Sequence, residues 1–243
     1  MTKRLENKVA LVTGASRGIG YATAKALAAE GAHVVAMART VGGLEDLDDA
    51  VKSAGGTTTL VPLDITDFDA IDRLGASIFE RWGKLDILVG NAGVLGKLSP
   101  LGHLDQKTWD NVMAVNVTAN WRLIRSLDPL LRASDAGRAV FLTSGAAISC
   151  KAYWGVYSTS KAALEALVKT FAAETQTSSL NVNLVNPGPV RTAMRAKAMP
   201  GEDPDILPKP AEFAQALLDT VLTSCEDTGE VFNFNDGKLE RRA

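Results

Sequence analysis

The chain has 243 residues, of which 46% are hydrophobic and 22% are charged, and its formal net charge at pH 7 is -2. A chain of this length and composition can bury a core without disulfides or metals. Its slightly acidic balance argues against nucleic-acid and membrane partners, which favour a basic face, and its two cysteines and two histidines are too scattered for a disulfide framework or a metal site.

Short apolar runs alternate with amphipathic stretches from the N-terminus onwards. The first run, Val9–Val12, is too short for a secretory signal or a membrane span, so we expect a cytoplasmic protein. Strands are expected at Val9–Val12, His33–Ala38, Thr58–Leu63, Leu85–Gly90, Ala139–Thr143, Asn181–Asn186 and Glu230–Asn233. Helices are expected between them, for example at Ile19–Glu30, Asp67–Trp82, Lys107–Leu131 and Val156–Thr175.

This alternation predicts an α/β fold. Several of the runs are apolar throughout, as strands buried on both faces of a parallel sheet are. Repeated strand–helix–strand units join such strands by right-handed crossovers. No linker, repeat or low-complexity segment divides the chain. We therefore expect a single domain over residues 1–243, built on a doubly wound, Rossmann-like parallel sheet of about seven strands with helices on both faces.

A glycine-rich turn follows the first strand, with the sequence Gly14-Ala15-Ser16-Arg17-Gly18-Ile19-Gly20. Glycines allow a tight turn, a close backbone approach to a pyrophosphate and close packing of the next helix, whose N-terminus attracts an anion. Such a turn could also be a mere strand–helix connection, but its place on the first strand of an alternating chain favours a dinucleotide site. The candidate cofactor-binding residues here are Gly14, Ser16, Arg17, Gly18, Ile19 and Gly20.

The end of the second strand indicates which dinucleotide is bound. NAD sites tend to place an acidic residue there, where it accepts hydrogen bonds from the ribose 2′-hydroxyl. This chain instead has Met37-Ala38-Arg39-Thr40. Arg39, helped by Arg17, could pair with a 2′-phosphate. We therefore predict NADP(H) rather than NAD(H); the alternative is that both arginines are only solvated.

Ser144, Tyr157 and Lys161 form a candidate catalytic group. Ser144 follows an apolar strand, while Tyr157 and Lys161 are four residues apart and share one face of a helix. Reduction of a ketone needs a proton donor, and a nearby ammonium lowers the pKa of a tyrosine towards that task. Ser144 could stabilise the developing charge on the substrate oxygen. The alternative is a core tyrosine beside a solvated lysine, which the glycine turn and Ser144 together disfavour.

The segment Pro187–Pro210 is a long excursion rich in proline and glycine, and we expect it to be a substrate lid loop. A floppy surface loop is the alternative. With Val94–Leu98 and Gly145–Trp154 it would line a mainly apolar pocket at the carboxyl ends of the strands. The nearby cations are Lys151, Arg191 and Arg195. They could steer an anionic group or only solvate the lid, so we expect an apolar or aromatic carbonyl substrate that could carry a remote acidic group.

These motifs together resemble the short-chain dehydrogenase/reductase family in its compact, single-domain form. The matching residues are Thr13-Gly14-x-x-x-Gly18-Ile19-Gly20, Asp64-Ile65, Asn91-Ala92-Gly93, Val115-Asn116, Ser144, Tyr157-x-x-x-Lys161 and Asn186-Pro187-Gly188. Their order and spacing match over nearly the whole chain. The resemblance implies an NADP-dependent oxidoreductase acting on a carbonyl or secondary alcohol, with Asn116, Ser144, Tyr157 and Lys161 as the catalytic residues.

The resemblance also implies roles for residues around the cofactor. Asp64 and Ile65 would lie against the adenine, and Asn91, Ala92 and Gly93 beside the cofactor. Asn116 would hold a water that links Lys161 to solvent, and Lys161 would also bind the nicotinamide ribose. Pro187 and Gly188 would border the nicotinamide, and Thr192 would reach its carboxamide or the pyrophosphate.

Two positions depart from the family pattern. Gly90 stands where the family often has Asn, which could loosen the adjoining turn. Asp236-Gly237-Lys238 replaces a C-terminal Asp-Gly-Gly, which puts the usual C-terminal subunit contacts in doubt.

The helix expected at Val156–Thr175 indicates that the protein assembles, because its apolar residues run too far around it for one buried stripe. We therefore expect a homo-oligomer through this helix and Lys107–Leu131, a tetramer in preference to a dimer.

Two other functions fit parts of the pattern. A cofactor-binding regulatory protein could use the same scaffold, but it would be expected to have lost one of the catalytic residues. A nucleotide-sugar epimerase or dehydratase resembles longer relatives with a separate substrate domain, for which 243 residues leave little room.

Overall fold

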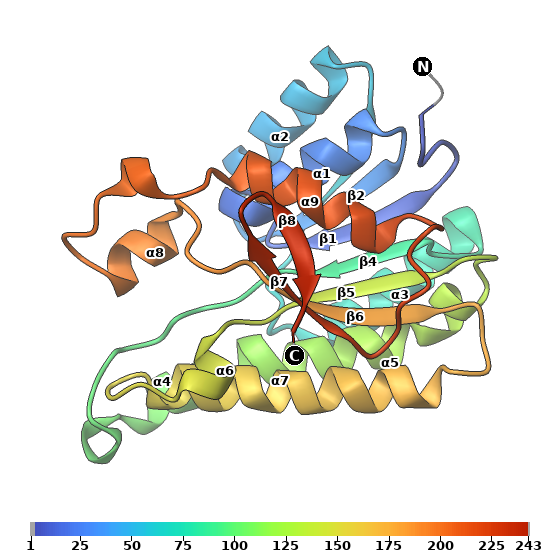
Figure 1. The fold of residues 1–243 in the computed structure, drawn as a ribbon. Coiled ribbons are helices and arrows are strands. Elements are labelled where there is room, and N and C mark those ends of the chain that lie inside the picture. The colour runs from blue at the N-terminus through green and yellow to red at the C-terminus, as the bar shows by residue number, and fades with distance from the viewer. Residues whose placement is uncertain (1–2, 243) are drawn as a thin grey trace.

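The computed structural model describes residues 3–242, and within them eight strands form one sheet in the order β3-β2-β1-β4-β5-β6-β7-β8 (Figure 1). The strands are β1 Val9–Thr13, β2 His33–Ala38, β3 Thr57–Pro62, β4 Ile87–Gly90, β5 Arg138–Leu142, β6 Asn181–Asn186, β7 Val231–Asn235 and β8 Lys238–Arg241. The first seven pair in parallel, and β8 pairs antiparallel to β7. The doubly wound, Rossmann-like sheet is confirmed, with one strand more than expected.

The additional strand closes a hairpin at the sheet edge. Asp236 and Gly237 link β7 to β8 with φ values of 46° and 79°, both in the left-handed region. Two consecutive left-handed residues make the tight turn that suits the twist of paired strands, and Asp-Gly is a typical sequence for it. The residues that depart from the family pattern therefore form a turn into an eighth strand.

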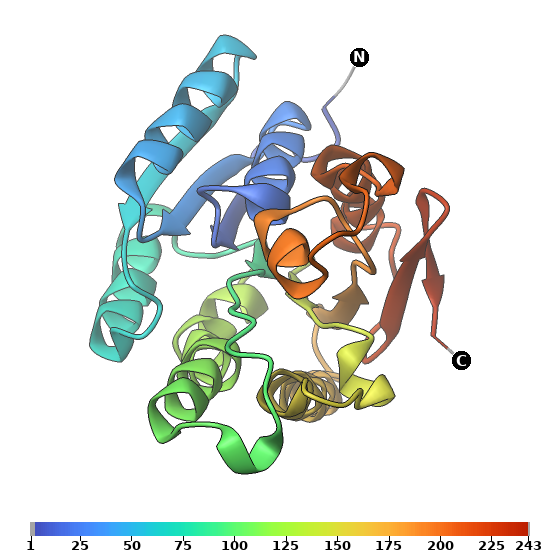
Figure 2. The ribbon, with the colours of Figure 1, turned by 90° about the vertical axis from the view of Figure 1, so that its left-hand side faces the viewer.

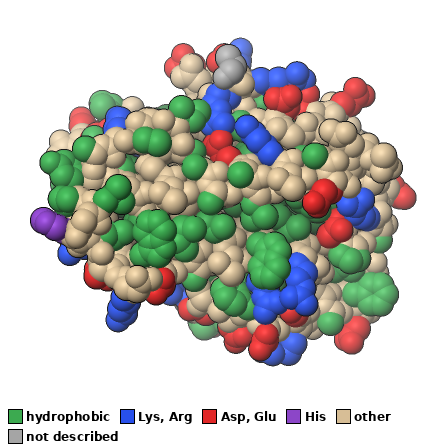
Figure 3. Space-filling view, turned by 90° about the horizontal axis from the view of Figure 1, so that it is seen from below, with side chains coloured by type: hydrophobic (Ala, Val, Ile, Leu, Met, Phe, Trp, Pro, Cys, Tyr) green, Lys and Arg blue, Asp and Glu red, His purple; other side chains and the backbone are tan. Residues whose placement is uncertain are grey.

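Helices cover both faces of the sheet. They are α1 Gly18–Ala29, α2 Val41–Ser53, α3 Phe68–Trp82, α4 Gln106–Met113, α5 Ala119–Arg132, α6 Ala146–Ser149, α7 Gly155–Glu174, α8 Ala193–Ala198 and α9 Pro210–Val221. In Figures 1 and 2, α1, α2 and α9 lie on one face and α3, α4, α5 and α7 on the other. Figure 3 looks onto the second layer from outside, where apolar side chains lie among charged ones.

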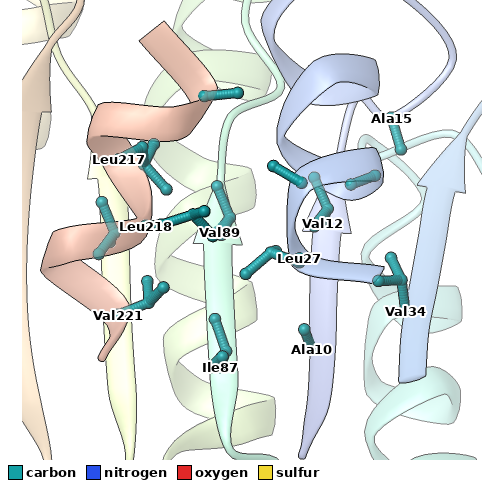
Figure 4. Close-up of a cluster of buried hydrophobic side chains, with 14 of the residues drawn as sticks. Ala10, Val12, Ala15, Leu27, Val34, Ile87, Val89, Leu217, Leu218 and Val221 are labelled. Atoms are coloured by element: carbon teal, nitrogen blue, oxygen red, sulfur yellow. The ribbon is translucent and has the colours of Figure 1, made fainter. Parts of the chain in front are cut away.

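The core is divided into two layers by the sheet. Along β1, Ala10 and Val12 pack beneath α1 and α9, while Val9 and Leu11 point into the opposite layer. Figure 4 shows the first layer, with Leu217 of α9 above the strands. Because successive strand side chains point to opposite faces, a strand covered on both faces must be apolar throughout, as the sequence is.

The helix expected at Lys107–Leu131 is interrupted. The expected range is helical, but a π-helical stretch at Ala114–Thr118 separates α4 from α5. A π stretch inserts extra backbone into a helix and often lies at a functional site. Here it contains Asn116, whose side chain bonds to the backbone of Val94 and to Ser160 rather than following a regular helical surface.

The segment Pro187–Pro210 contains helical structure in place of a plain loop. It includes α8 and a 3₁₀ turn at Pro204–Ile206, and Pro210 is already the first residue of α9. Two ion pairs lie within it, Arg195–Glu202 and Arg191–Asp205. Among the described residues no helix combines the length and the hydropathy that crossing a membrane requires.

Candidate active site

A cavity of about 110 Å³ lies beyond the carboxyl ends of β5 and β6, on the side that Figure 2 faces. Its walls include Ile19, Ser144, Tyr157, Gly188, Thr192 and Met194. The glycine turn, the candidate catalytic group and the segment after β6 therefore meet at one place. A larger hollow of about 310 Å³ lies between β3 and α3, but none of the expected site residues lines it.

The backbone of the glycine turn needs its glycines. Gly14 and Gly18 have φ values of 67° and 59°, which residues with a side chain rarely adopt. A side chain on Gly20 would collide with the carbonyl oxygen of Gly14. The helix α1 begins after Arg17 with no side-chain cap and no acidic residue in its first turn. Its first amide groups therefore point to this end of the sheet as donors for an anion.

Arg39 leaves the end of β2 and lies beside Asp64. Its guanidinium is 3.6 Å from the Asp64 carboxylate, and both side chains are well exposed. Asp64 also accepts hydrogen bonds from the backbone and the hydroxyl of Thr66, which hold it in place, and Ile65 next to it is buried. Arg39, expected at the 2′-phosphate, and Asp64, expected against the adenine, are thus neighbours in space.

The turn after β4 is tied to β1 by Thr13. The Thr13 hydroxyl accepts hydrogen bonds from the amides of Asn91 and Ala92 at 3.0 and 2.9 Å, and the Asn91 side chain donates to the Thr13 carbonyl at 2.8 Å. Gly90, a departure from the family pattern that could loosen this turn, lies against the ring of Phe141, which fills the space of a side chain. The turn is held in spite of the glycine.

Asn116 links this turn to α7. Its side-chain oxygen accepts from the amide of Val94, and its side-chain nitrogen donates to the Val94 carbonyl and to Ser160, all at 2.9 Å. The Asn116 carbonyl accepts from Asn120. Asn116 is fully buried, so its side chain positions the residues after β4 against the helix that carries Tyr157.

Tyr157 and Lys161 lie on the buried face of α7, and Ser144 lies two residues beyond the end of β5 rather than directly after it. The Lys161 ammonium is 5.9 Å from the centre of the Tyr157 ring. It donates to the Leu142 carbonyl at 2.7 Å. A side chain on Gly93 would come within 3.7 Å of this ammonium, so the glycine leaves room around it.

Burial dominates the protonation of both groups. Burial lowers the pKa of Lys161 to about 8, against the charge of Glu165, which raises it. Burial raises the pKa of Tyr157 above its usual value, and a hydrogen bond with Ser144 opposes that rise. The lowered tyrosine pKa that the sequence suggested is therefore not seen in the protein alone, because loss of hydration penalises the phenolate.

The backbone after β6 is anchored on Asn186. Its side-chain oxygen accepts from the amides of Gly145 and Gly188, each at 3.1 Å, and so joins the two segments that border the cavity. Gly188 has a φ of 63°. Thr192 caps α8 by accepting from the amide of Arg195, and its methyl group faces Gly18. The expected nicotinamide-side residues thus lie opposite the glycine turn.

Sequence reasoning missed several residues that shape the site. Thr143 and Glu165 hydrogen-bond to each other beneath the catalytic group, and Arg242 pairs with Glu165. Glu165 lies four residues after Lys161, a spacing that places it on the same helical face. Arg242 is separated from Glu165 by 77 residues, and nothing in the local sequence indicates that contact.

Comparisons with known proteins place this geometry among dehydrogenases. The family model described as short chain dehydrogenase matches residues 8–203. The oxidoreductase YciK of Escherichia coli is 37% identical over 217 residues, which are 88% of this chain and 86% of that protein. An NAD-dependent oxidoreductase of Mycobacterium tuberculosis is 37% identical over 78% of this chain and 74% of that one. A short chain dehydrogenase structure from Shigella flexneri, complexed with NADP, matches with a TM-score of 0.92 and 35% identity over 96% of this chain and 99% of that chain.

Proposed function

Because the chain belongs to the short-chain dehydrogenase family of oxidoreductases, we propose that it transfers a hydride between NADP(H) and a carbonyl or secondary-alcohol substrate, with Tyr157 as general acid/base. One observation carries the proposal. Tyr157 and Ser144 line the same cavity as Ile19 of the glycine turn and Gly188 of the segment after β6. A substrate oxygen in that cavity would meet two hydroxyl groups beside the dinucleotide site.

The residues around the glycine turn fit a dinucleotide. The uncapped first turn of α1 offers amide donors to the pyrophosphate. Asp64 and Ile65 would hold the adenine, Asn91 to Gly93 would lie beside the cofactor, and Pro187, Gly188 and Thr192 would border the nicotinamide.

NADP(H) is preferred over NAD(H) because Arg39 stands where an acidic residue would hold a 2′-hydroxyl. The exposed guanidinium of Arg39 would bind the 2′-phosphate, and Arg17 adds a second exposed cation. The Shigella relative bound to NADP supports this choice.

When bound, NADP(H) supplies or accepts the hydride. The Tyr157 hydroxyl donates a proton to the substrate oxygen in reduction, and the Tyr157 phenolate accepts the proton of the alcohol in oxidation, while Ser144 donates a hydrogen bond that stabilises the charge on that oxygen. With a pKa of about 8, Lys161 is mostly protonated at pH 7, and its buried charge favours the phenolate that burial alone disfavours. Lys161 would also bind the nicotinamide ribose through the donors that Leu142 leaves free.

Asn116 completes the proton path. Both N–H groups of its side-chain amide are used in binding Val94 and Ser160, and its main-chain oxygen accepts a hydrogen bond from the Asn120 side chain. A carbonyl oxygen has two lone pairs. A water on the second lone pair would link Lys161 to solvent and replace the proton that Tyr157 gives up.

The substrate is an apolar or aromatic carbonyl compound held beneath a lid. Leu95, Trp154, Val190 and Met194 give the cavity a mainly apolar lining, and the lid would be the segment 187–210. Arg191 and Arg195 are paired with Asp205 and Glu202, so their charge is largely compensated. The exposed Lys151, whose backbone carbonyl accepts a hydrogen bond from the amide of the cavity residue Trp154, would be the remaining cation for a remote acidic group.

The Tyr157→Phe variant tests the mechanism. It keeps the ring and removes the titrating hydroxyl, so we expect turnover to fall roughly 10²–10⁴-fold while cofactor affinity changes little. Turnover is followed by NADPH absorbance over a panel of apolar ketones, aromatic ketones and keto acids, with sugars and polyols for comparison. Cofactor affinity is measured by nucleotide fluorescence.

Tyr21→Phe is the matched control, because the Tyr21 hydroxyl contacts the Asp46 carbonyl away from the cavity. It should behave like the parent. Near-parental turnover in Tyr157→Phe would disprove the acid/base assignment. Cofactor binding without turnover of any carbonyl by the parent would instead favour a regulatory protein.

A further inference from the structure

Glu165 occupies a position directly behind the catalytic group. It lies one helical turn beyond Lys161 on α7, and 7% of its surface is exposed. One of its carboxylate oxygens accepts hydrogen bonds from the Thr143 hydroxyl at 2.8 Å and from Arg242 at 2.9 Å. The other accepts from the second guanidinium nitrogen of Arg242. Three donor groups therefore hold this carboxylate.

Arg242 reaches Glu165 because the C-terminal hairpin docks on the sheet. The strand β8 pairs with β7, and the amide of Arg242 then donates to the Val231 carbonyl at 2.7 Å. The Arg242 side chain is 16% exposed and the Glu165 side chain 10%. A bidentate, partly buried arginine–carboxylate pair has a much more specific geometry than an ion pair on the surface.

Thr143, one of the two partners of Glu165, is next to the catalytic residue Ser144 in the chain. Thr143 lies between Leu142, whose carbonyl accepts from Lys161, and Ser144. Lys161 donates to Leu142, and no hydrogen bond joins it to Glu165 within the described residues. A carboxylate this close to a buried ammonium would otherwise be its natural partner.

We propose that Arg242 is a positioning residue of the active site: by binding the Glu165 carboxylate it keeps that carboxylate from pairing with Lys161, and so leaves the Lys161 ammonium available to Tyr157 and to the cofactor. The inference rests on the proposed function for its purpose, but the arrangement itself is a matter of charge and geometry. Through Thr143, the same pair also holds the backbone that carries Ser144.

The charges around Lys161 set the direction of the expected effects. Tyr157 and Glu165 face it from α7, Lys169 lies one turn beyond Glu165, and Arg242 approaches from the end of β8; the groups from β5 and from the π-helical stretch are neutral. Removing Arg242 leaves the Glu165 charge uncompensated, which favours the protonated lysine. Removing the Glu165 charge leaves an uncompensated Arg242, which disfavours it.

The test is a direct titration of Lys161 by carbon NMR, in protein labelled at the lysine Cε carbons. Its pKa of about 8 separates this residue from ordinary lysines, and Lys161→Met assigns the signal. We expect R242Q to raise this pKa by about one pH unit, the size of shift that one nearby unpaired charge produces in a partly buried site. We expect E165Q to lower it and the double variant to return it close to the parent value.

Arg241→Gln is the matched control, since Arg241 pairs with Asp227 at the surface, and it should leave the Lys161 titration unchanged. If the Arg242–Glu165 pair only stabilised the fold, R242Q and E165Q would not shift the Lys161 pKa in opposite directions. The proposal would be overturned if the two variants shifted this pKa with the same sign or not at all. It would also be overturned if Arg241→Gln produced a shift equal to that of R242Q. If R242Q alone does not fold, the comparison of the other two variants remains: the pKa of Lys161 must be higher in the double variant than in E165Q.

Kinetics provide the second readout and separate the two proposals. The pH dependence of kcat should shift in the same direction as the Lys161 titration in each variant. Opposite NMR shifts without any carbonyl-reducing activity would support the role of Arg242 and reject the proposed reaction. Carbonyl-reducing activity without opposite NMR shifts would support the proposed reaction and reject the role of Arg242.

Discussion

Lys161 is a residue whose chemistry opposes the stability of the fold. Burial lowers its pKa from 10.5 to about 8, so below pH 8 the folded protein holds an ammonium that would be better hydrated in the unfolded chain. Between pH 8 and 10.5 the unfolded chain binds more protons than the folded protein, and this residue makes stability rise with pH. The free-energy cost of burying the Lys161 ammonium is therefore fully present at neutral pH and decreases towards alkaline pH.

The Lys161→Met variant should for this reason be more stable than the parent while losing activity. We expect a gain of about 1–3 kcal/mol in the free energy of unfolding at pH 7, which allows for the lost hydrogen bond to Leu142. The gain should shrink at pH 9.5. Urea unfolding at both pH values measures it, with Lys169→Met on the exposed side of the same helix as control. A variant that is less stable at pH 7 would contradict the expectation.

Arg39 is the residue on which cofactor choice should depend. Its side chain is 65% exposed, and its guanidinium is 3.6 Å from the Asp64 carboxylate. Loss of a charge-assisted contact to a 2′-phosphate costs about 1.5–3 kcal/mol, so Arg39→Gln should weaken NADPH binding roughly 10–100-fold and NADH binding little. Titration of both cofactors checks this, with Arg132→Gln on α5 as control. Equal or tighter NADH binding by the parent would reject the NADP assignment.

At the scale of elements, the contact between β4 and β5 explains an unusual glycine. Gly90 ends β4 and pairs with Phe141 of β5 in parallel register. A side chain at position 90 would enter the space of the Phe141 ring and approach the Asn120 side chain. The small residue and the large ring are therefore complementary in size.

Gly90→Ala should accordingly destabilise the protein, although alanine normally improves a strand. Overpacking of a rigid core typically costs about 1–3 kcal/mol, and Phe141 is fully buried. Gly42→Ala is the control, since a side chain there meets no atom within 4 Å, and it should be neutral or slightly stabilising. Thermal unfolding of both variants decides the matter, and equal stabilities would show that Phe141 moves aside at no cost.

At the scale of the whole molecule, the outer faces of α5 and α7 are the surface on which we expect assembly. The buried side of α7 packs on its own core through residues such as Leu164, Val168 and Phe171. Its outer side carries the small residues Ala162, Ala166 and Ala173, and Trp121 of α5 is 45% exposed. Small side chains on a helix allow another helix to approach closely.

We expect a tetramer, or failing that a dimer, built through this face. Ala166→Arg should reduce the molar mass measured by light scattering at micromolar concentration, because a long cation cannot be buried between close helices. Ala76→Arg on the exposed side of α3 is the control. A monomeric parent would contradict the prediction. The charged edge strand β8, with Lys238, Glu240 and Arg241 exposed, is the less favourable surface for further contacts.

The sequence by itself determined the features that depend on neighbouring residues. The alternation of apolar strands and helices predicts the doubly wound sheet, the glycine spacing predicts the turn into α1, and the spacing of Tyr157 and Lys161 predicts their common helical face. An Asp-Gly turn before β8 was also present in the sequence, although the eighth strand was not expected. These patterns are local because backbone geometry repeats every two residues in a strand and every 3.6 in a helix.

Only the tertiary structure decided how distant residues share charge and space. Arg242 binds Glu165 from 77 residues away, Asn116 binds Val94 from within a π-helical stretch, and the Phe141 ring fills the space beside Gly90. Even the direction of the Tyr157 pKa shift follows from burial, which is the sum of many packing contacts. Such effects depend on the three-dimensional neighbours of a residue, and no periodic pattern in the sequence indicates them.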